Sequence, residues 1–263
     1  MKSFVLTRGR LLIIGIAIVS LGICIGAACR TKDVFSVNGR EVPIYSVQRT
    51  DRKLALTFNC AWNDEDIDGI LEILDKYKIK ATFFVVGDWA EKYPDAVKKL
   101  CGAGMEIGNH SYNHAHYSAM TKDAIIADMQ KCDDAVFKIT GEKIYLFRGA
   151  YGEYDDKTIK ACDETGRTYI QWSKDSLDYK AQSCGEIISR VTQNAAAGDI
   201  ILMHNGTQYT KDSLDAILEN LTKRFELCKV SELIYFAHGF YAQPYILKTA
   251  GAQFGSCGIQ RDF

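Results

Sequence analysis

Short apolar runs alternate with amphipathic helical patterns along most of the sequence, and this alternation constrains the fold more than any other feature. Residues 54–58 form an apolar run typical of a buried strand, and Ile67, Ile70 and Leu74 then follow at the spacing of one helix face. The same pattern predicts strands at 54–58, 81–86, 105–108, 145–147, 168–172 and 199–203, and helices at 64–77, 94–102, 121–139, 155–165, 184–196 and 211–225. We therefore expect an α/β fold with a mostly parallel sheet covered by helices.

The number of units favours one kind of sheet. Six or seven strand–helix units within about 190 residues fit a distorted (β/α) barrel better than a flat sheet. Functional residues of such folds gather at the carboxyl ends of the strands. The expected organisation is a cytoplasmic tip and membrane segment at 1–30, a linker or edge strands at 31–52, the α/β domain at 53–236, and an irregular C-terminal tail at 237–263.

The N-terminus predicts a location. Residues 11–29 carry no charged side chain, and as a helix they would span about 28 Å, close to the hydrocarbon thickness of a bilayer. Lys2, Arg8 and Arg10 precede them, which places the N-terminus in the cytoplasm and the rest of the chain outside. The run is longer than the ~7–15 residues of a signal-peptide core, which favours an uncleaved single-pass anchor over cleavage or lipidation near Cys29.

Net charge and cysteine content bear on the possible partners of the chain and on its disulfide bonds. The net charge is −1, so nothing in the overall balance suggests a nucleic-acid partner. Seven of the nine cysteines follow the membrane segment without a CxxC pair, and an odd number leaves at least one thiol unpaired within the chain. The disulfide pairing and the oligomeric state are not readable from this pattern.

Polar side chains follow the predicted strands where each one ends. The residues at these ends are Asn59, Cys60, Trp62 and Asp64; His110, His114 and His116; Arg148 and Tyr151; Asp175 and Asp178; and His204. One helical turn would bring the imidazoles of His110 and His114 to the same side. Two neutral imidazoles need one more protein donor and a water to make a catalytic zinc site. Any one of these residues alone is more often structural, but their shared location indicates a metal-capable site.

Five motifs in order resemble those of the polysaccharide deacetylases of the NodB-homology group, carbohydrate esterase family four. They are Thr57-Phe58-Asn59-Cys60 for Thr-Phe-Asp-Asp, His110-Ser111-Tyr112-Asn113-His114 for His-Ser-x-x-His, Arg148-Gly149-Ala150-Tyr151-Gly152 for Arg-x-Pro-Tyr-Gly, Asp175-Ser176-Leu177-Asp178-Tyr179 for Asp-x-x-Asp-Trp, and Leu202-Met203-His204 for Leu-x-His. The resemblance covers residues 53–235, about 70% of the chain. It implies a distorted barrel that hydrolyses acetyl groups on glycans such as peptidoglycan or chitin.

The resemblance also implies a catalytic arrangement. His110 and His114 would hold a divalent metal, usually zinc, which polarises the acetyl carbonyl and activates a water. His204 would protonate the leaving amine, and Asp178 would orient and charge that imidazole.

Four further residues receive roles from the same resemblance. The backbone N–H of Tyr151 would help to stabilise the oxyanion, and Arg148 would fix the residue at the position of the catalytic base. Tyr179 and Trp62 are expected to contact the sugar.

Two substitutions make this chemistry conditional. The family has two aspartates, a base and a metal ligand, where this chain has Asn59 and Cys60. A carboxamide has no titratable proton acceptor near neutral pH, so Asn59 can orient a water but cannot act as a general base. Cys60 either completes a Cys-His-His site as a thiolate or is a buried thiol beside a weak site. Asp64 and His116 are candidate substitutes as ligand or base.

The leading hypothesis is therefore a membrane-anchored, extracytoplasmic, metal-dependent deacetylase of cell-wall glycan, with peptidoglycan amino sugars as the expected substrate. The alternative is a glycan-binding pseudoenzyme, because Asn59 and Cys60 replace the two aspartates. A thiol-based site at Cys60 is a weaker third reading, since no second cysteine lies nearby in the sequence. N-acetyl and O-acetyl substrates are both left open.

Overall fold

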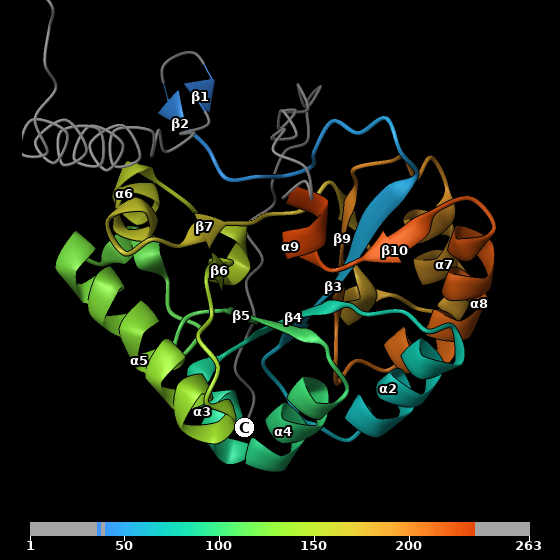
Figure 1. Cartoon of the computed structure of the whole chain (residues 1–263), viewed down its shortest axis with the longest axis horizontal. Helices are drawn as coiled ribbons and strands as arrows, with labels where there is room; N and C mark the ends of the chain where they lie inside the picture. Colours follow the sequence, from blue (N-terminus) through green and yellow to red (C-terminus); the bar gives the residue numbers. More distant parts are fainter. Residues whose placement is uncertain (1–35, 38–39, 235–263) are drawn as a thin grey trace, which may run out of the picture. The chain divides into compact units, whose positions relative to one another are not determined.

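The computed structural model describes residues 36–37 and 40–234 (Figure 1). The membrane segment expected within residues 1–30 and the tail expected at 237–263 lie outside the described residues. Inside them, no helix combines the length and the apolar character needed to cross a membrane. In the region expected to be a linker or edge strands, β1 (Ser36–Val37) pairs with β2 (Arg40–Glu41) as an antiparallel hairpin.

Eight parallel strands form the main sheet of the described part of the chain, in the order β7-β6-β5-β4-β3-β9-β8 with β10 paired to β3. The strands are β3 (Lys53–Cys60), β4 (Thr82–Val85), β5 (Glu106–Asn109), β6 (Leu146–Phe147), β7 (Thr168–Tyr169), β8 (Lys174–Asp175), β9 (Ile200–His204) and β10 (Glu226–Cys228). This confirms the predicted parallel α/β architecture.

Strand β3 is the centre of the sheet and explains its curvature. Its partner along one edge is β9. Along the other edge, β10 pairs with the first residues of β3 and β4 pairs with the last. Two strands that share one edge must diverge from each other, so the sheet curls into a half-barrel. This curled parallel sheet is the form that the expected distorted (β/α) barrel takes in this chain.

A short segment connects the end strand β7 of this curled sheet with the start of β9. Ile44 makes a bridge with Ile170, just after β7, and Ser46 makes a bridge with Asp199, just before β9. Hydrogen bonds of 2.9 Å from Ile44 N to Tyr169 O and 3.0 Å from Val47 N to the carbonyl of residue 198 support these bridges. We call residues 44–47 the strap.

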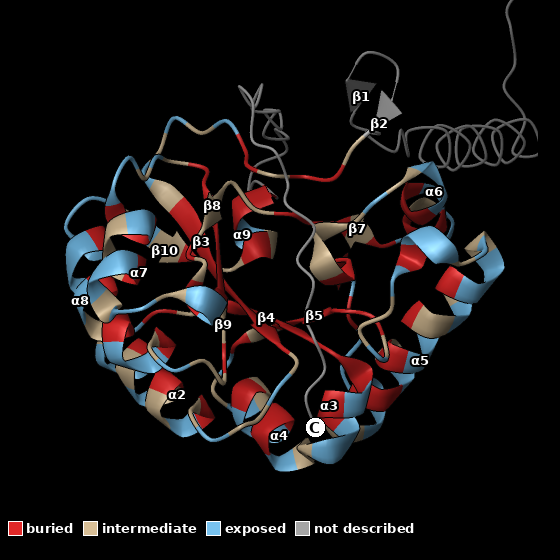
Figure 2. Cartoon of the chain, turned by 180° about the vertical axis from the view of Figure 1, so that it is seen from behind, coloured by how far each residue is buried: buried red, intermediate tan, exposed pale blue. Residues whose placement is uncertain are grey.

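Helix α9 (Val230–Ile234) packs on the inner face of the sheet, where Val230 and Leu233 share a hydrophobic cluster with Ala55 and Phe84 (Figure 1). The other helices cover the outer face. They are α2 (Ile67–Lys76), α3 (Gly87–Lys92), α4 (Pro94–Gly102), α5 (Lys122–Thr140), α6 (Asp156–Glu164), α7 (Cys184–Thr192) and α8 (Thr210–Thr222). Figure 2 shows their buried faces turned toward the strands and their exposed faces turned outward. Helix α5 begins as predicted, because the side chain of Thr121 caps it by accepting from Ala124 N at 3.3 Å.

The alternation of side chains along β3 decides what reaches the inside of the curl. Leu54, Leu56, Phe58 and Cys60 point toward the helices and belong to the largest hydrophobic core, together with residues of α2 and α8. Side chains of a strand point to opposite faces in turn, so Asn59 belongs to the inner face. Neighbouring residues of one predicted motif are thereby sent in opposite directions.

Candidate active site

A cavity of about 90 Å³ opens at the carboxyl ends of the strands. Its lining comes from loops that follow different strands, as parallel folds favour. The lining residues are Asn59, Ala61, Trp62, His110, His114, Tyr151, Gly152, Trp172, Asp175, Tyr179, Leu202 and His204. Eight of the residues selected from the sequence are in this set: Asn59, Trp62, His110, His114, Tyr151, Asp175, Tyr179 and His204.

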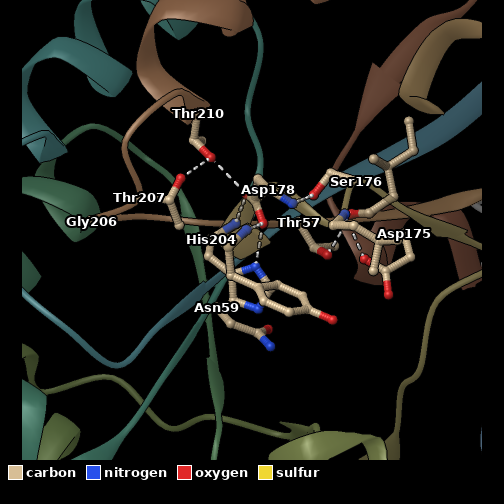
Figure 3. Close-up of polar contacts among 12 residues, drawn as sticks. Thr57, Asn59, Asp175, Ser176, Asp178, His204, Gly206, Thr207 and Thr210 are labelled. Carbon is tan, nitrogen blue, oxygen red and sulfur yellow. Dashed lines mark hydrogen bonds and ion pairs between the residues drawn. The ribbon is translucent and has the colours of Figure 1, made fainter. Parts of the chain in front are cut away.

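Asp178 and His204 form a buried acid–imidazole pair behind one wall of the cavity. Asp178 Oδ1 lies 2.7 Å from His204 Nδ1, and Asp178 Oδ2 accepts from His204 N and from Thr210 Oγ1, each at 2.6 Å (Figure 3). Burial acts to raise the pKa of Asp178, but the charge and hydrogen bonds of His204 and the Thr210 hydroxyl outweigh it and hold that pKa below its usual value. The ionised carboxylate therefore keeps a proton on Nδ1 of His204 and leaves Nε2 for the cavity.

Two aromatic rings flank this imidazole. The ring centroid of Trp62 lies 5.3 Å from that of His204, and the ring centroid of Tyr179 lies 5.5 Å from it. Both aromatic residues are more than a third exposed. An exposed apolar ring beside a proton-transfer group is an arrangement suited to holding a sugar, because sugar rings present C–H faces to aromatic surfaces.

Arg148 fixes the orientation of Asn59. The guanidinium is fully buried, and its Nη1 donates to Asn59 Oδ1 at 3.0 Å and to Thr57 Oγ1 at 2.8 Å. Arginine can only donate, so the oxygen of the amide must face it and the NH2 group must face away. Asn59 is paired in register with His204 on the neighbouring strand and lines the cavity. The amide therefore presents a hydrogen-bond donor where a general base is needed.

Arg148 is a buried charge held by neutral acceptors. Besides Thr57 and Asn59 it donates to the Gln171 carbonyl at 3.0 Å, and its guanidinium lies 4.0 Å from the ring centroid of Phe84. Burial lowers the pKa of Arg148 to about 9. In the described part of the chain, no carboxylate lies within ion-pair distance of this guanidinium.

His110 and His114 meet in the cavity as predicted, but not through a helical turn. Their ring centroids are 5.0 Å apart, and His114 adopts a left-handed backbone with φ 56° in an irregular loop. His110 Nδ1 lies 2.8 Å from the carbonyl oxygen of Arg148, so this nitrogen carries the proton and Nε2 keeps its lone pair. Burial lowers the pKa of His110 well below its usual value and lowers that of His114 to about 4, so both rings are neutral at physiological pH.

This donor pair does not complete a catalytic zinc site. Cys60 is fully buried on the helix-facing side of β3, and burial raises the pKa of its thiol well above the usual value. Neither Cys60 nor Asp64 lines the cavity. Among the residues that the structure describes, no three His, Cys, Asp or Glu side chains are grouped to hold a metal ion. Catalytic zinc sites use three protein ligands, so the described donors do not fit one, and the ligand role of Cys60 stays a prediction.

Asp175 is the residue that the motif contained but that received no role. It is the one carboxylate on the described cavity lining, where its Oδ1 accepts from Leu177 N at 2.9 Å. Burial raises its pKa above the usual value. Trp172, which also lines the cavity, ends a predicted strand, so a search of every strand-end residue would have included it.

The comparisons with known proteins agree with this geometry. Residues 46–170 match the family model described as polysaccharide deacetylase. A peptidoglycan-N-acetylglucosamine deacetylase of Bacillus cereus is 30% identical over 74% of this chain and 93% of its own length. The chain belongs to the polysaccharide deacetylase family.

Solved structures of this family place the chain near both active and inactive members. A peptidoglycan N-acetylglucosamine deacetylase is 31% identical with a TM-score of 0.69, covering 72% of this chain and 91% of that one. A structure described as a CE4 family pseudoenzyme from Bacillus anthracis is 32% identical with a TM-score of 0.70, covering 73% of this chain and 68% of that one. A mutant of that pseudoenzyme is described as having restored enzymatic activity.

The first curated relatives are longer than the region they share with this chain. The match spans 60% of the YlxY protein of Bacillus subtilis, 63% of a second Bacillus cereus peptidoglycan deacetylase, and 41% of a Listeria monocytogenes peptidoglycan deacetylase. This chain therefore corresponds to only part of each of these relatives.

Proposed function

We propose that this polysaccharide deacetylase family member is a membrane-anchored protein whose α/β domain lies outside the cytoplasm and takes an N-acetylated amino sugar of peptidoglycan into its cavity. Relatives named as peptidoglycan deacetylases support the choice of glycan. The apolar run at residues 11–29, with basic residues before it, supports the location. Trp62 and Tyr179 beside His204 support a sugar ring as the occupant.

We further propose that the natural protein binds this glycan and hydrolyses it slowly or not at all. The observation that carries this proposal is the hydrogen bond from Arg148 to the oxygen of Asn59, which leaves only an NH2 group at the position of the base. General-base catalysis contributes roughly 10²–10⁴-fold to such reactions, and this contribution is missing. The incomplete set of metal-binding side chains also lowers the expected rate of hydrolysis.

The test compares the full-length protein with Asn59→Asp in detergent. Glycan binding is measured by calorimetry with an N-acetylglucosamine oligomer, and hydrolysis by acetate release from peptidoglycan fragments. We expect both proteins to bind and Asn59→Asp to release acetate at least about 100-fold faster. Asn220→Asp, which makes the same chemical change on the exposed face of α8, is the matched control. If wild type and Asn59→Asp release acetate at the same rate, the proposal that Asn59 prevents hydrolysis is wrong. If neither protein binds the oligomer, the proposed glycan ligand is wrong.

A second candidate, hydrolysis by the natural protein, is favoured by the intact Asp178–His204 pair. An imidazole backed by a buried carboxylate can accept a proton from water and pass it to the leaving amine. On this proposal the wild type releases acetate and His204→Gln abolishes the release while leaving Asn59 in place. On the first proposal, His204→Gln has an effect only in the Asn59→Asp background.

The membrane anchor is proposed to remain uncleaved. Mass spectrometry of the protein recovered from the membrane fraction tests this, because the intact chain has a mass of 29.4 kDa. A shorter mature N-terminus near Cys29, with or without a lipid, would replace the anchor by cleavage or lipidation.

A further inference from the structure

Tyr151 lines the cavity in a conformation that its own backbone does not favour. It belongs to the short helical turn Ala150–Gly152 and has φ 59° and ψ 6°, in the left-handed region. Residues other than glycine adopt this region at a cost and keep it when their surroundings hold them there. The contacts around Tyr151 therefore decide the position of this part of the cavity wall.

His116 contacts one face of the Tyr151 ring. The two ring centroids are 3.9 Å apart and the ring planes differ by 5°, so the rings are stacked. His116 itself is more than half exposed and is not part of the cavity lining. Its ring can therefore influence the shape of the cavity through Tyr151.

Glu153 ties the same histidine to the loop that carries Tyr151. His116 Nδ1 lies 2.9 Å from Glu153 Oε1, and Glu153 Oε2 accepts from Ser118 Oγ at 2.9 Å. The backbone carbonyl of Glu153 accepts from Tyr169 Oη at 2.6 Å, which holds the loop from its inner side. The segment 116–118 thus contacts this loop at Tyr151 and at Glu153.

Tyr151 also contacts His114, one of the two histidines that line the cavity. Its ring centroid lies 4.4 Å from that of His114, with the ring planes at 68°. A shift of Tyr151 would therefore change both the wall of the cavity and the packing of His114. The order of contact runs from His116 through Tyr151 to His114.

We propose that His116 is a positioning residue that, with Glu153, holds Tyr151 against His114 and so sets the shape of the glycan-binding cavity. This inference rests on the proposed function for the role of the cavity, but the contact it describes is independent of any ligand. Exposed ion pairs contribute little to stability, so removal of this pair changes the cavity without unfolding the domain.

The experiment uses the full-length protein in detergent with three variants. His116→Ala removes both the stack and the hydrogen bond, His116→Phe keeps the stack alone, and Glu153→Gln keeps an acceptor without the charge. Lys223→Ala, which removes an exposed ion pair with Glu219 on α8, is the matched control. The ring-proton resonances of Tyr151, assigned by Tyr151→Phe, report the stack directly, because a stacked imidazole shifts them.

We expect His116→Ala to move the Tyr151 resonances and to weaken binding of an N-acetylglucosamine oligomer by about five- to tenfold, the scale of one lost aromatic or charged contact. His116→Phe should keep the resonances of the stacked ring and recover most of the affinity. The control should change neither property, and all melting temperatures should stay within a few degrees of wild type. Unmoved Tyr151 resonances, or unchanged affinity after they move, would overturn the proposal.

Failure of the proposed function gives a different result. If wild type binds no glycan while His116→Ala still moves the Tyr151 resonances, the contact stands as a determinant of the cavity and the glycan assignment fails. If wild type binds the glycan and the resonances do not move, the glycan assignment stands and His116 has no positioning role.

Discussion

Asp178 holds His204 by two groups at once, the backbone N–H at 2.6 Å and the imidazole Nδ1 at 2.7 Å. The strand end and the ring are therefore fixed by one carboxylate, and the ring cannot turn without breaking a charged hydrogen bond. This geometry holds the imidazole in one orientation and gives the first prediction.

Asp178→Asn should abolish most of the activity gained by Asn59→Asp. An amide at position 178 cannot stabilise the imidazolium that forms when His204 exchanges its proton, so acetate release should fall by about 10²–10⁴-fold. Acetate release from peptidoglycan fragments measures this in the double variant. Retention of full activity would show that His204 acts without its carboxylate.

The same carboxylate predicts how stability depends on pH. The pKa of Asp178 is lowered in the folded protein, so its contribution is complete above the unfolded pKa of about 4 and is lost as pH falls through the lower folded value. Urea unfolding between pH 6 and about pH 2.5 should show a free energy of unfolding that falls with pH more steeply in wild type than in Asp178→Asn. Parallel profiles for the two proteins would contradict the assignment.

Asn59→Asp should also stabilise the fold. The buried Arg148 charge would gain a carboxylate in place of a neutral amide oxygen, and charged hydrogen bonds exceed neutral ones by about 1–2 kcal/mol. Chemical denaturation at pH 7 measures the change, with Asn220→Asp as the control for added negative charge. A lower free energy of unfolding for Asn59→Asp would mean that the desolvation of a second charge outweighs the pairing.

Zinc should not remain bound to the natural protein through dialysis. His110 and His114 supply two imidazoles, one fewer donor than a catalytic zinc site requires. Elemental analysis after dialysis should find well below one zinc per chain, and a chelator should leave glycan affinity unchanged. One retained zinc that is lost in both His110→Ala and His114→Ala would reveal a third donor that completes the site.

Cys60 should be among the least reactive thiols. It is fully buried in the core, and burial raises its pKa, whereas Cys101 and Cys184 are partly exposed. Timed alkylation followed by mass spectrometry should modify Cys101 and Cys184 well before Cys60. Early modification of Cys60 in folded protein would instead support the thiol-based reading.

The sequence predicted the larger elements of the sheet because they carry long periodic patterns. The pattern of β3 and the Thr121 cap of α5 were both readable and are confirmed. Helix α3 was missed because its six residues follow β4 directly, and β8 and β10 are too short to show a period. The half-barrel form of the predicted distorted barrel was not readable in detail, because the sharing of one edge of β3 by two strands is a long-range pairing.

The sequence predicted which residues form the site better than it predicted which way their side chains point. Strand ends brought Asn59, His110, His114 and His204 to one cavity, as the parallel architecture requires. The inward direction of Asn59 and the outward direction of Cys60 follow from the period of two along β3, which the sequence already contained. The pairing of His116 with Glu153 depends on two distant loops and left no local pattern.

The strap affects the order in which contacts of the domain form during synthesis. Residues 44–47 precede every strand of the main sheet, yet their partners at Tyr169, Ile170 and Asp199 are made much later in synthesis. Contacts between such distant positions form slowly, because the chain between them must be ordered first. The first part of the domain to leave the ribosome is therefore among the last to find its partners, and until then the backbone after β7 and before β9 is available to other chains.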